Sequence, residues 1–93
     1  MNKLEEVSKW SDYNKVKQIG NKYNMDILLS TRKDKKYMVK FGSKYIHFGQ
    51  MGYKDFTLTN DENKKRLFQL RNARWLNADK FTPAWLSYHI IWA

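Results

Sequence analysis

Residues 37–48 read YMVKFGSKYIHF, and this stretch decides the fold of the chain. Two five-residue runs of alternating character flank Gly42-Ser43, and a glycine at the first position of a two-residue connection allows the positive φ of a type II′ turn. The predicted β-hairpin has the register Val39 to Ile46, Tyr37 to Phe48 and Phe41 to Lys44. One of its faces is therefore almost wholly apolar. The other face carries Met38, Lys40, Tyr45 and His47.

The segment before the hairpin predicts a third strand and a helix. Residues 26–31 read DILLST and are joined to the hairpin by the charged turn 32–36, which indicates a three-stranded antiparallel meander. Further upstream, Tyr13, Val16 and Ile19 recur at helical spacing. Ser11 or Asp12 is the candidate N-cap, and Gly20 is expected to end the helix. Residues 4–10 extend this helix or form a second piece, and the sequence leaves both open.

After the hairpin the sequence predicts a structured loop over 49–57 and two helices. Thr59 and Glu62 fit a capping box, which starts a helix running from about residue 60 to 75. Thr82 and Pro83 give a strong second helix start, and that helix runs to about Trp92. The fold class is therefore α+β: an N-terminal helix, a three-stranded antiparallel meander, then two C-terminal helices packed on the sheet.

The composition excludes some classes of function but does not identify one. The 93 residues are enough for one small domain, residues 1–93, and 18 Lys plus Arg against nine Asp plus Glu give a net charge of +9, which favours a polyanionic partner. No cysteine is present, so a thiol nucleophile, a disulfide framework and a Cys-based zinc site are excluded. There is neither an apolar run long enough to span a membrane nor a secretory signal, so we expect no membrane partner and no secretion.

The positive charge is concentrated around the hairpin. Residues 32–54 hold seven basic residues and one acidic residue, a net of +6. Cations interleaved with aromatic rings are typical of surfaces that contact phosphates and stack on exposed bases. A solvated sheet face is the alternative explanation. The candidate nucleic-acid-binding residues are Lys33, Lys35, Lys36, Lys40, Lys44, Tyr45, His47 and Arg71.

Arg71 is unusual because it falls on the same side of its predicted helix as Leu67, Phe68 and Leu70. A buried guanidinium needs a partner. We expect an internal pair with Asp55 or Asp79, stacking on Trp75, or contact with a ligand anion, and the internal pair is favoured.

Catalytic and metal sites have weaker support in the sequence. His47 has no acidic neighbour on its strand, and His89 lies in an apolar segment. Asp55 and Asp61 could converge on a cation, but loop hydrogen bonding by Asp55 and favourable placement of Asp61 in the first helical turn explain them better. The sequence therefore predicts no catalytic residue, no metal and no cofactor, with a metal-dependent nuclease as an outside alternative.

Residues 37–93 resemble a family of small uncharacterised proteins from large DNA viruses of algae and protists and from some bacteriophages. The resemblance rests on His-Phe-Gly at 47–49, Gly-Tyr-x-Asp-Phe-Thr at 52–57 and Pro-Ala-Trp-Leu at 83–86 followed by Trp92; residues 1–31 are divergent. Many members have Thr-x-His-Lys-Asp where this chain has Leu58-Thr59-Asn60-Asp61, which weakens a metal role there. The positions that match are His47, Gly49, Gly52, Tyr53, Asp55, Thr57 and Asp61.

The resemblance implies a viral protein, located in the virion or in the cytoplasm or nucleus of the infected cell. Together with the charge, it leads to the hypothesis of a non-enzymatic basic protein that binds a polyanion through its lysine-rich hairpin, with nucleic acid, DNA or RNA, as the expected polyanion. The alternative is a minor capsid or cement protein that binds an acidic surface of other virion proteins.

Overall fold

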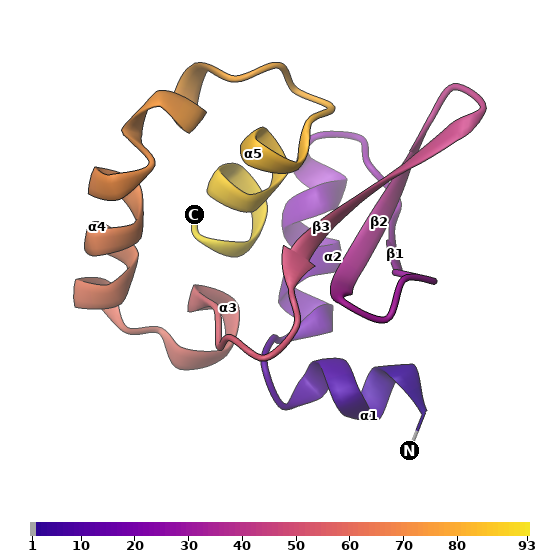
Figure 1. The fold of residues 1–93 in the computed structure, drawn as a ribbon, viewed down its shortest axis with the longest axis horizontal. Helices are drawn as coiled ribbons and strands as arrows, with labels where there is room; N and C mark the ends of the chain where they lie inside the picture. Colours follow the sequence, from indigo (N-terminus) through magenta and orange to yellow (C-terminus); the bar gives the residue numbers. More distant parts are fainter. Residues whose placement is uncertain (1) are drawn as a thin grey trace.

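A three-stranded antiparallel sheet, in the order β1-β2-β3, lies at the centre of the fold. The computed structural model describes residues 2–93 and confirms the α+β class (Figure 1). Its elements are α1 (Lys3–Ser8), α2 (Tyr13–Lys22), β1 (Ile27–Leu29), β2 (Lys35–Phe41), β3 (Lys44–Gln50), α3 (Phe56–Thr59), α4 (Glu62–Arg71), the 3₁₀-helix η1 (Ala73–Asn77), α5 (Pro83–Leu86) and the π-helix η2 (Ser87–Ile91).

The predicted hairpin and its register are confirmed. Val39 pairs with Ile46, Tyr37 with Phe48 and Phe41 with Lys44, and β1 adds to β2 as the third strand. Gly42 has a φ of +65°, as the predicted turn requires. The strands β2 and β3 extend further than predicted, from Lys35 to Gln50, and β1 is shorter.

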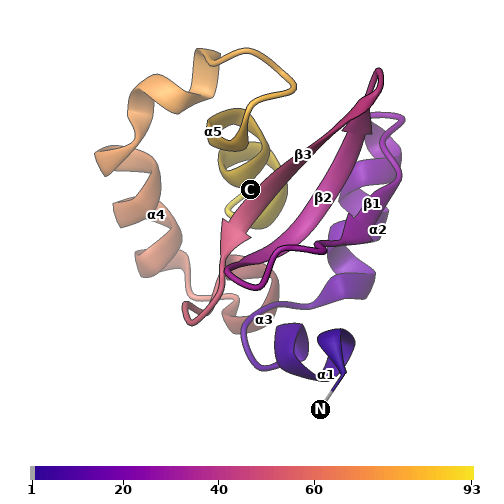
Figure 2. The same cartoon turned by 45° about the vertical axis from the view of Figure 1, so that its right-hand side comes forward.

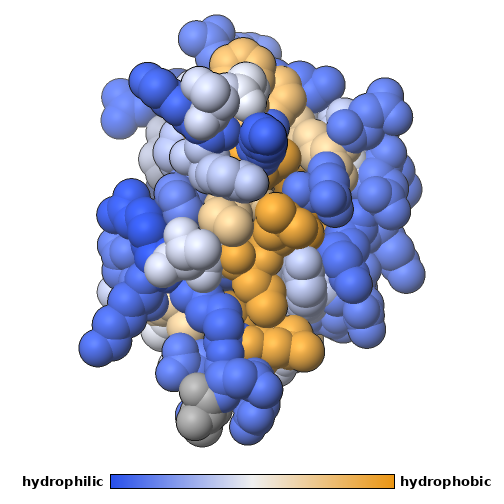
Figure 3. Space-filling model, turned by 90° about the vertical axis from the view of Figure 1, so that its right-hand side faces the viewer, coloured by the Kyte–Doolittle hydropathy of each residue, from blue (hydrophilic) through white to orange (hydrophobic). Residues whose placement is uncertain are grey.

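Helices cover one face of the sheet. Figure 2 shows α2 and α5 behind the strands, on the side where the core lies. The core consists of buried apolar residues from these elements, from α1 and η2, and from the connection before β1: Val7, Val16, Met25, Ile27, Tyr37, Val39, Phe48, Leu86, Ile90 and Ile91. On the side of the molecule that carries β1 and the hairpin, Figure 3 shows an apolar stripe bordered by hydrophilic residues.

The N-terminal part forms two separate helices, which settles the choice that the sequence left open. Asp12 is the N-cap of α2, and its side chain accepts a hydrogen bond from the Lys15 amide. The prediction that Gly20 ends this helix is wrong, because α2 continues to Lys22. Gly20 instead lies where the helix meets β1, and a Cβ built there would be 2.5 Å from Cγ1 of Ile27.

This contact makes Gly20→Ala a destabilising change. Inserting a methyl group against the buried Ile27 side chain overpacks the core, at a cost of about 1–3 kcal/mol in the free energy of unfolding. The better helix propensity of alanine offsets about 1 kcal/mol of that cost. Urea denaturation measures the difference, with the exposed Asn21→Ala in the same helix as the matched control. Equal stability of the two variants would contradict the tight contact.

The predicted helix over residues 60–75 is divided in the structure. A short helix, α3, occupies the end of the predicted loop, α4 follows, and the chain after Arg71 continues as η1. The capping box is also wrong, since Asp61 caps α4 by accepting from the amides of Asn63 and Lys64. Thr59 instead accepts a hydrogen bond from the Asp61 amide. Asn60, with a φ of +54°, separates the two helices.

The last helix starts as predicted. Thr82 accepts from the Trp85 amide, and Pro83 occupies the first helical position. From Ser87 the helix widens into the π form and ends at Ile91, with Leu86, Ile90 and Ile91 in the core. Among residues 2–93, no helix has both the length and the apolar character needed to cross a membrane.

Candidate functional site

The predicted cluster of hairpin lysines does not form one surface. Lys36 is 2% exposed, and its Nζ lies 3.1 Å from Oδ2 of the fully buried Asp55. The same Nζ donates to the Tyr53 carbonyl oxygen at 2.6 Å. The loop after β3 folds back over the start of β2 and covers this lysine; its Met51 amide donates to the Asp34 carbonyl at 3.0 Å. The prediction that Lys36 contacts phosphate is therefore wrong.

The other hairpin candidates are spread over the strands. Lys40 pairs with the exposed Tyr45, whereas Lys44 pairs with Phe41 at the next register position, so the two lysines belong to opposite faces. Lys33 is exposed in the turn after β1, at the other end of the sheet.

His47 is engaged with Ser30, the residue that follows β1. Its Nδ1 is 2.7 Å from Oγ of Ser30. Burial, together with the nearby Arg32 guanidinium, lowers the pKa of His47 below its ordinary value. The lowered pKa favours the neutral ring and disfavours the charged form that would contact a phosphate.

A buried polar network surrounds the Lys36–Asp55 pair. The Thr57 hydroxyl donates to Oδ1 of Asp55, and the Tyr37 hydroxyl donates to Oγ of Ser11 at 2.6 Å. Ser11 and Thr57 are joined by their hydroxyls, 3.1 Å apart. Burial lowers the pKa of Lys36, and its pair with Asp55 opposes that shift. The network ties the start of α2, the sheet and α3 together, so it has a structural role.

Two adjoining cavities lie between the rest of the domain and the segment formed by α4 and η1. The outer one, which we call the basic groove, has a volume of about 460 Å³. Its walls include Trp10, Tyr53, Lys54, Lys64, Leu67, Arg71 and Trp92. The groove therefore brings together the first inter-helix connection, the loop after β3, α4 and the C-terminus.

The second cavity, the inner chamber, has a volume of about 630 Å³. Its walls include Lys35, Gln50, Phe68, Trp75, Ala84 and Ser87. Tyr53, Arg71 and Trp92 belong to the walls of both cavities, so they mark the junction between the two.

The charged side chains in the walls of both cavities are all positive. Lys54, Lys64 and Arg71 are exposed, and no aspartate or glutamate among residues 2–93 lines either cavity. The expected internal pair of Arg71 is not found: Asp55 is paired with Lys36, and no ion pair within the described residues includes Arg71. Leu67 and Leu70, expected beside Arg71 in the interior, are 55% and 68% exposed.

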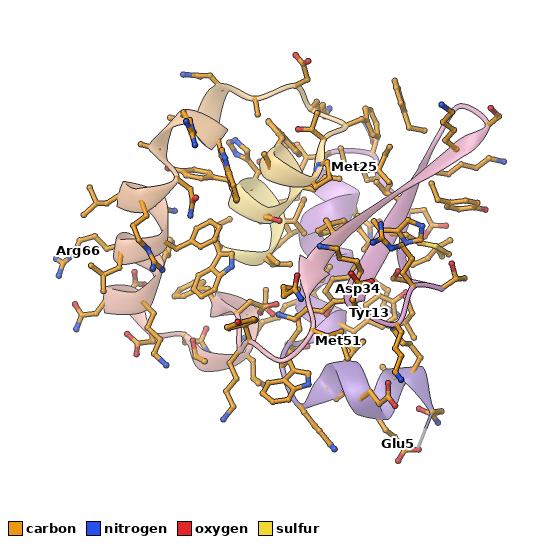
Figure 4. All side chains as sticks on the ribbon, in the orientation of Figure 1. Glu5, Tyr13, Met25, Asp34, Met51 and Arg66 are labelled. Atoms are coloured by element: carbon orange, nitrogen blue, oxygen red, sulfur yellow. The ribbon has the colours of Figure 1, made fainter. Side chains whose placement is uncertain are left out.

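The segment that forms the outer wall is held by aromatic and polar contacts to the C-terminus. Phe68 stacks on Trp92 with ring centroids 4.7 Å apart and planes 8° from parallel. The Gln69 amide donates to the Trp92 carbonyl at 3.1 Å, and Nε2 of His89 donates to the Leu76 carbonyl at 3.0 Å. Figure 4 shows side chains extending into the space between α4 and α5, with Arg66 projecting outward.

Neither Asp55 nor Asp61 lies in a metal site. Asp55 caps α3 and pairs with Lys36, and Asp61 caps α4. Over residues 2–93, no three His, Asp or Glu side chains come together in a way that could hold a metal ion.

Sequence reasoning included Arg71 and Lys35 but missed Lys54 and Lys64 as binding candidates. Tyr53, 68% exposed at the junction, was marked only as a position shared with the resembling family. Its sequence signal is an aromatic residue followed by a lysine in a glycine-containing loop, and that signal is weak without the structure.

Comparisons with known proteins give a family but no activity. Neither a curated protein nor a solved structure matches the chain. A family model described as "Family of unknown function (DUF5754)" matches residues 25–72. The matched part runs from the approach to β1 through the end of α4, and it includes the loop with Tyr53 and Asp55. Because this match covers more than half of the sequence, the chain belongs to the family of unknown function DUF5754.

Proposed function

We propose that this protein is a non-enzymatic nucleic-acid-binding protein that holds a single strand along the basic groove. The observation that carries the proposal is the composition of the groove walls: three exposed cations, three aromatic residues and no carboxylate side chain among residues 2–93. Cations along a groove bind the phosphates of a strand, and rings beside them stack on its bases. The proposed partner is the nucleic acid that the composition predicts, but the proposed binding site is the groove and not the hairpin.

Each group in the groove has a defined task in this proposal. Lys54 and Lys64 face the groove from its two walls, one in the loop after β3 and one on α4, and both contact phosphates. Arg71, free of an internal ion pair in the described part of the chain, makes a third contact at the junction. Tyr53 offers its exposed ring for stacking.

A single strand suits this site better than a duplex. Stacking on a side chain requires a base whose face is free, whereas the faces of duplex bases are covered by their neighbours. Phosphate contacts alone carry no sequence information, so we expect little preference among base sequences. In keeping with the resemblance of residues 44–57 and 83–92, the proposal includes a viral or phage origin and a location with the genome, in the virion or the infected cell.

Binding of a fluorescent single-stranded oligonucleotide tests the proposal. We expect the purified protein to raise the fluorescence anisotropy of the oligonucleotide at low salt, with affinity falling steeply toward physiological salt. A duplex of the same sequence is expected to bind more weakly. Absence of any salt-dependent binding to DNA or RNA strands would refute the proposed function.

Tyr53→Ala tests the stacking contact. Loss of one base-aromatic stack costs about 1–3 kcal/mol, so the affinity for the oligonucleotide should fall roughly 5- to 150-fold. The matched control is Tyr45→Ala, which removes another exposed tyrosine from the hairpin face. We expect wild-type affinity for the control. If Tyr45→Ala weakened binding and Tyr53→Ala did not, the hairpin and not the groove would be the binding surface.

A second candidate function is a cement protein that binds other virion proteins. It is favoured by three exposed leucines on α4 and η1, Leu67, Leu70 and Leu76, since large apolar side chains exposed to water are available for protein contacts. Retention of capsid protein in pull-down experiments, without salt-dependent oligonucleotide binding, would favour this candidate.

A further inference from the structure

The inner chamber has a form and composition that the binding of a phosphate backbone does not need. Its volume of about 630 Å³ is within the range of small-molecule sites, and most of its walls are apolar or aromatic. Phe68, Trp75 and Trp92 contribute rings from three separate segments of the chain. Trp75 meets the edge of Phe68, with ring centroids 5.8 Å apart and planes at 72°. A planar apolar ligand fits such walls.

The polar groups of the chamber suit the edge of a heterocycle. Within residues 2–93, the Ser87 hydroxyl makes no hydrogen bond, and Gln50 uses only its Oε1, which accepts from Nζ of Lys35. The Gln50 amide nitrogen and the Ser87 hydroxyl are therefore free to bond a ligand. Glutamine amides and hydroxyls are common partners of base edges. Thr82, in contrast, is already engaged as the helix cap.

Arg71 is placed where it could bind the phosphate of a ligand whose base lies in the chamber. Its side chain belongs to the walls of the groove and of the chamber, together with Tyr53 and Trp92. A phosphate held by Arg71 would therefore lie at the junction, and the base attached to it could enter the chamber while the strand continues along the groove.

We infer that the inner chamber receives one unstacked nucleobase of the bound strand, with the phosphate of that nucleotide at Arg71. The inference rests on the proposed function and deepens it. The protein then has a nucleotide pocket beside a sequence-independent groove, and free nucleoside 5′-monophosphates are ligands of the pocket alone.

The test on the unmodified protein compares ligands with and without a base. Nucleoside 5′-monophosphates should quench the tryptophan fluorescence and displace the labelled oligonucleotide. Ribose 5-phosphate, which has the sugar and phosphate but no base, should bind at least tenfold more weakly. Equal affinity of ribose 5-phosphate and all four nucleotides would overturn the inference, because only the phosphate would then be recognised.

A chamber-filling variant separates this inference from the proposed function. Ala84, half-buried in the chamber wall, is replaced by phenylalanine; Ala73→Phe, at an exposed position outside both cavities, is the matched control. We expect A84F to lose nucleotide binding at least tenfold while it still binds the oligonucleotide with an unchanged salt dependence. Unchanged nucleotide binding by A84F would overturn the inference and leave the groove in place. Failure of the wild type to bind any strand would overturn both this inference and the proposed function.

Discussion

Asp55→Ala is expected to lower the free energy of unfolding by about 3–5 kcal/mol, because it leaves the buried ammonium group of Lys36 without its counter-charge. The Lys36 side chain is 2% exposed and Asp55 is fully buried, so water cannot replace the lost partner. The substitution also removes the cap of α3 and the acceptor of the Thr57 hydroxyl. Stability of a domain of this size is of the order of 5–15 kcal/mol, so the loss is a large part of the total.

The matched control for this substitution is Asp34→Ala. Asp34 pairs with Arg32 at 3.3 Å, but both side chains are more than half exposed. An exposed pair contributes about 0–1 kcal/mol, so the control should unfold almost as the wild type does. Urea denaturation followed by circular dichroism measures both variants. A loss below about 1 kcal/mol for D55A would show that the buried pair does not hold the loop on the sheet.

Neutralising the three cations of the basic groove is expected to weaken strand binding by about a hundredfold or more. The variant combines Lys54→Gln, Lys64→Gln and Arg71→Gln, all at exposed positions where folding should not suffer. Each lost phosphate contact costs about 1 kcal/mol or more near physiological salt, roughly a factor of five, and three contacts multiply.

The hairpin lysines provide the control for this variant. Lys33→Gln, Lys40→Gln and Lys44→Gln remove the same three charges from exposed positions outside the groove. Both variants have a net charge of +6 instead of +9, so a general effect of net charge would weaken both equally. We expect the hairpin variant to keep its affinity within a few-fold of wild type. Anisotropy titrations with one oligonucleotide compare the three proteins.

The sheet could be predicted from the sequence because its signals are local. Alternation on both sides of Gly42 fixes the hairpin register, and Thr82 with Pro83 fixes the start of the last helix. Lys36 shows where local signals fail. Its burial depends on Asp55, nineteen residues away, and on the loop that covers the start of β2. Strand periodicity contains no information on such a covering loop.

The candidate site was less predictable because it is formed by distant segments. Helical periodicity placed Leu67 and Leu70 in the interior, but α4 contacts the domain mainly through Phe68 and Gln69, so the leucines are exposed. The sequence identified Arg71 as unusual and named Asp55 as a candidate partner. It could not show that Asp55 is already paired with Lys36. The grouping of Arg71 with Lys54 and Lys64 depends on how α4 and the loop after β3 face each other, and this follows only from the tertiary fold.

The salt dependence of strand binding, measured in parallel for wild type and the two triple variants, tests the central claim most directly. For three phosphate contacts on a single strand, the logarithm of the association constant should fall with the logarithm of salt concentration with a slope of about −2. The groove location predicts this slope for wild type and for the hairpin variant, and a slope near zero for K54Q/K64Q/R71Q. A groove variant that keeps the full slope, or a hairpin variant that loses it, would contradict the groove as the binding site.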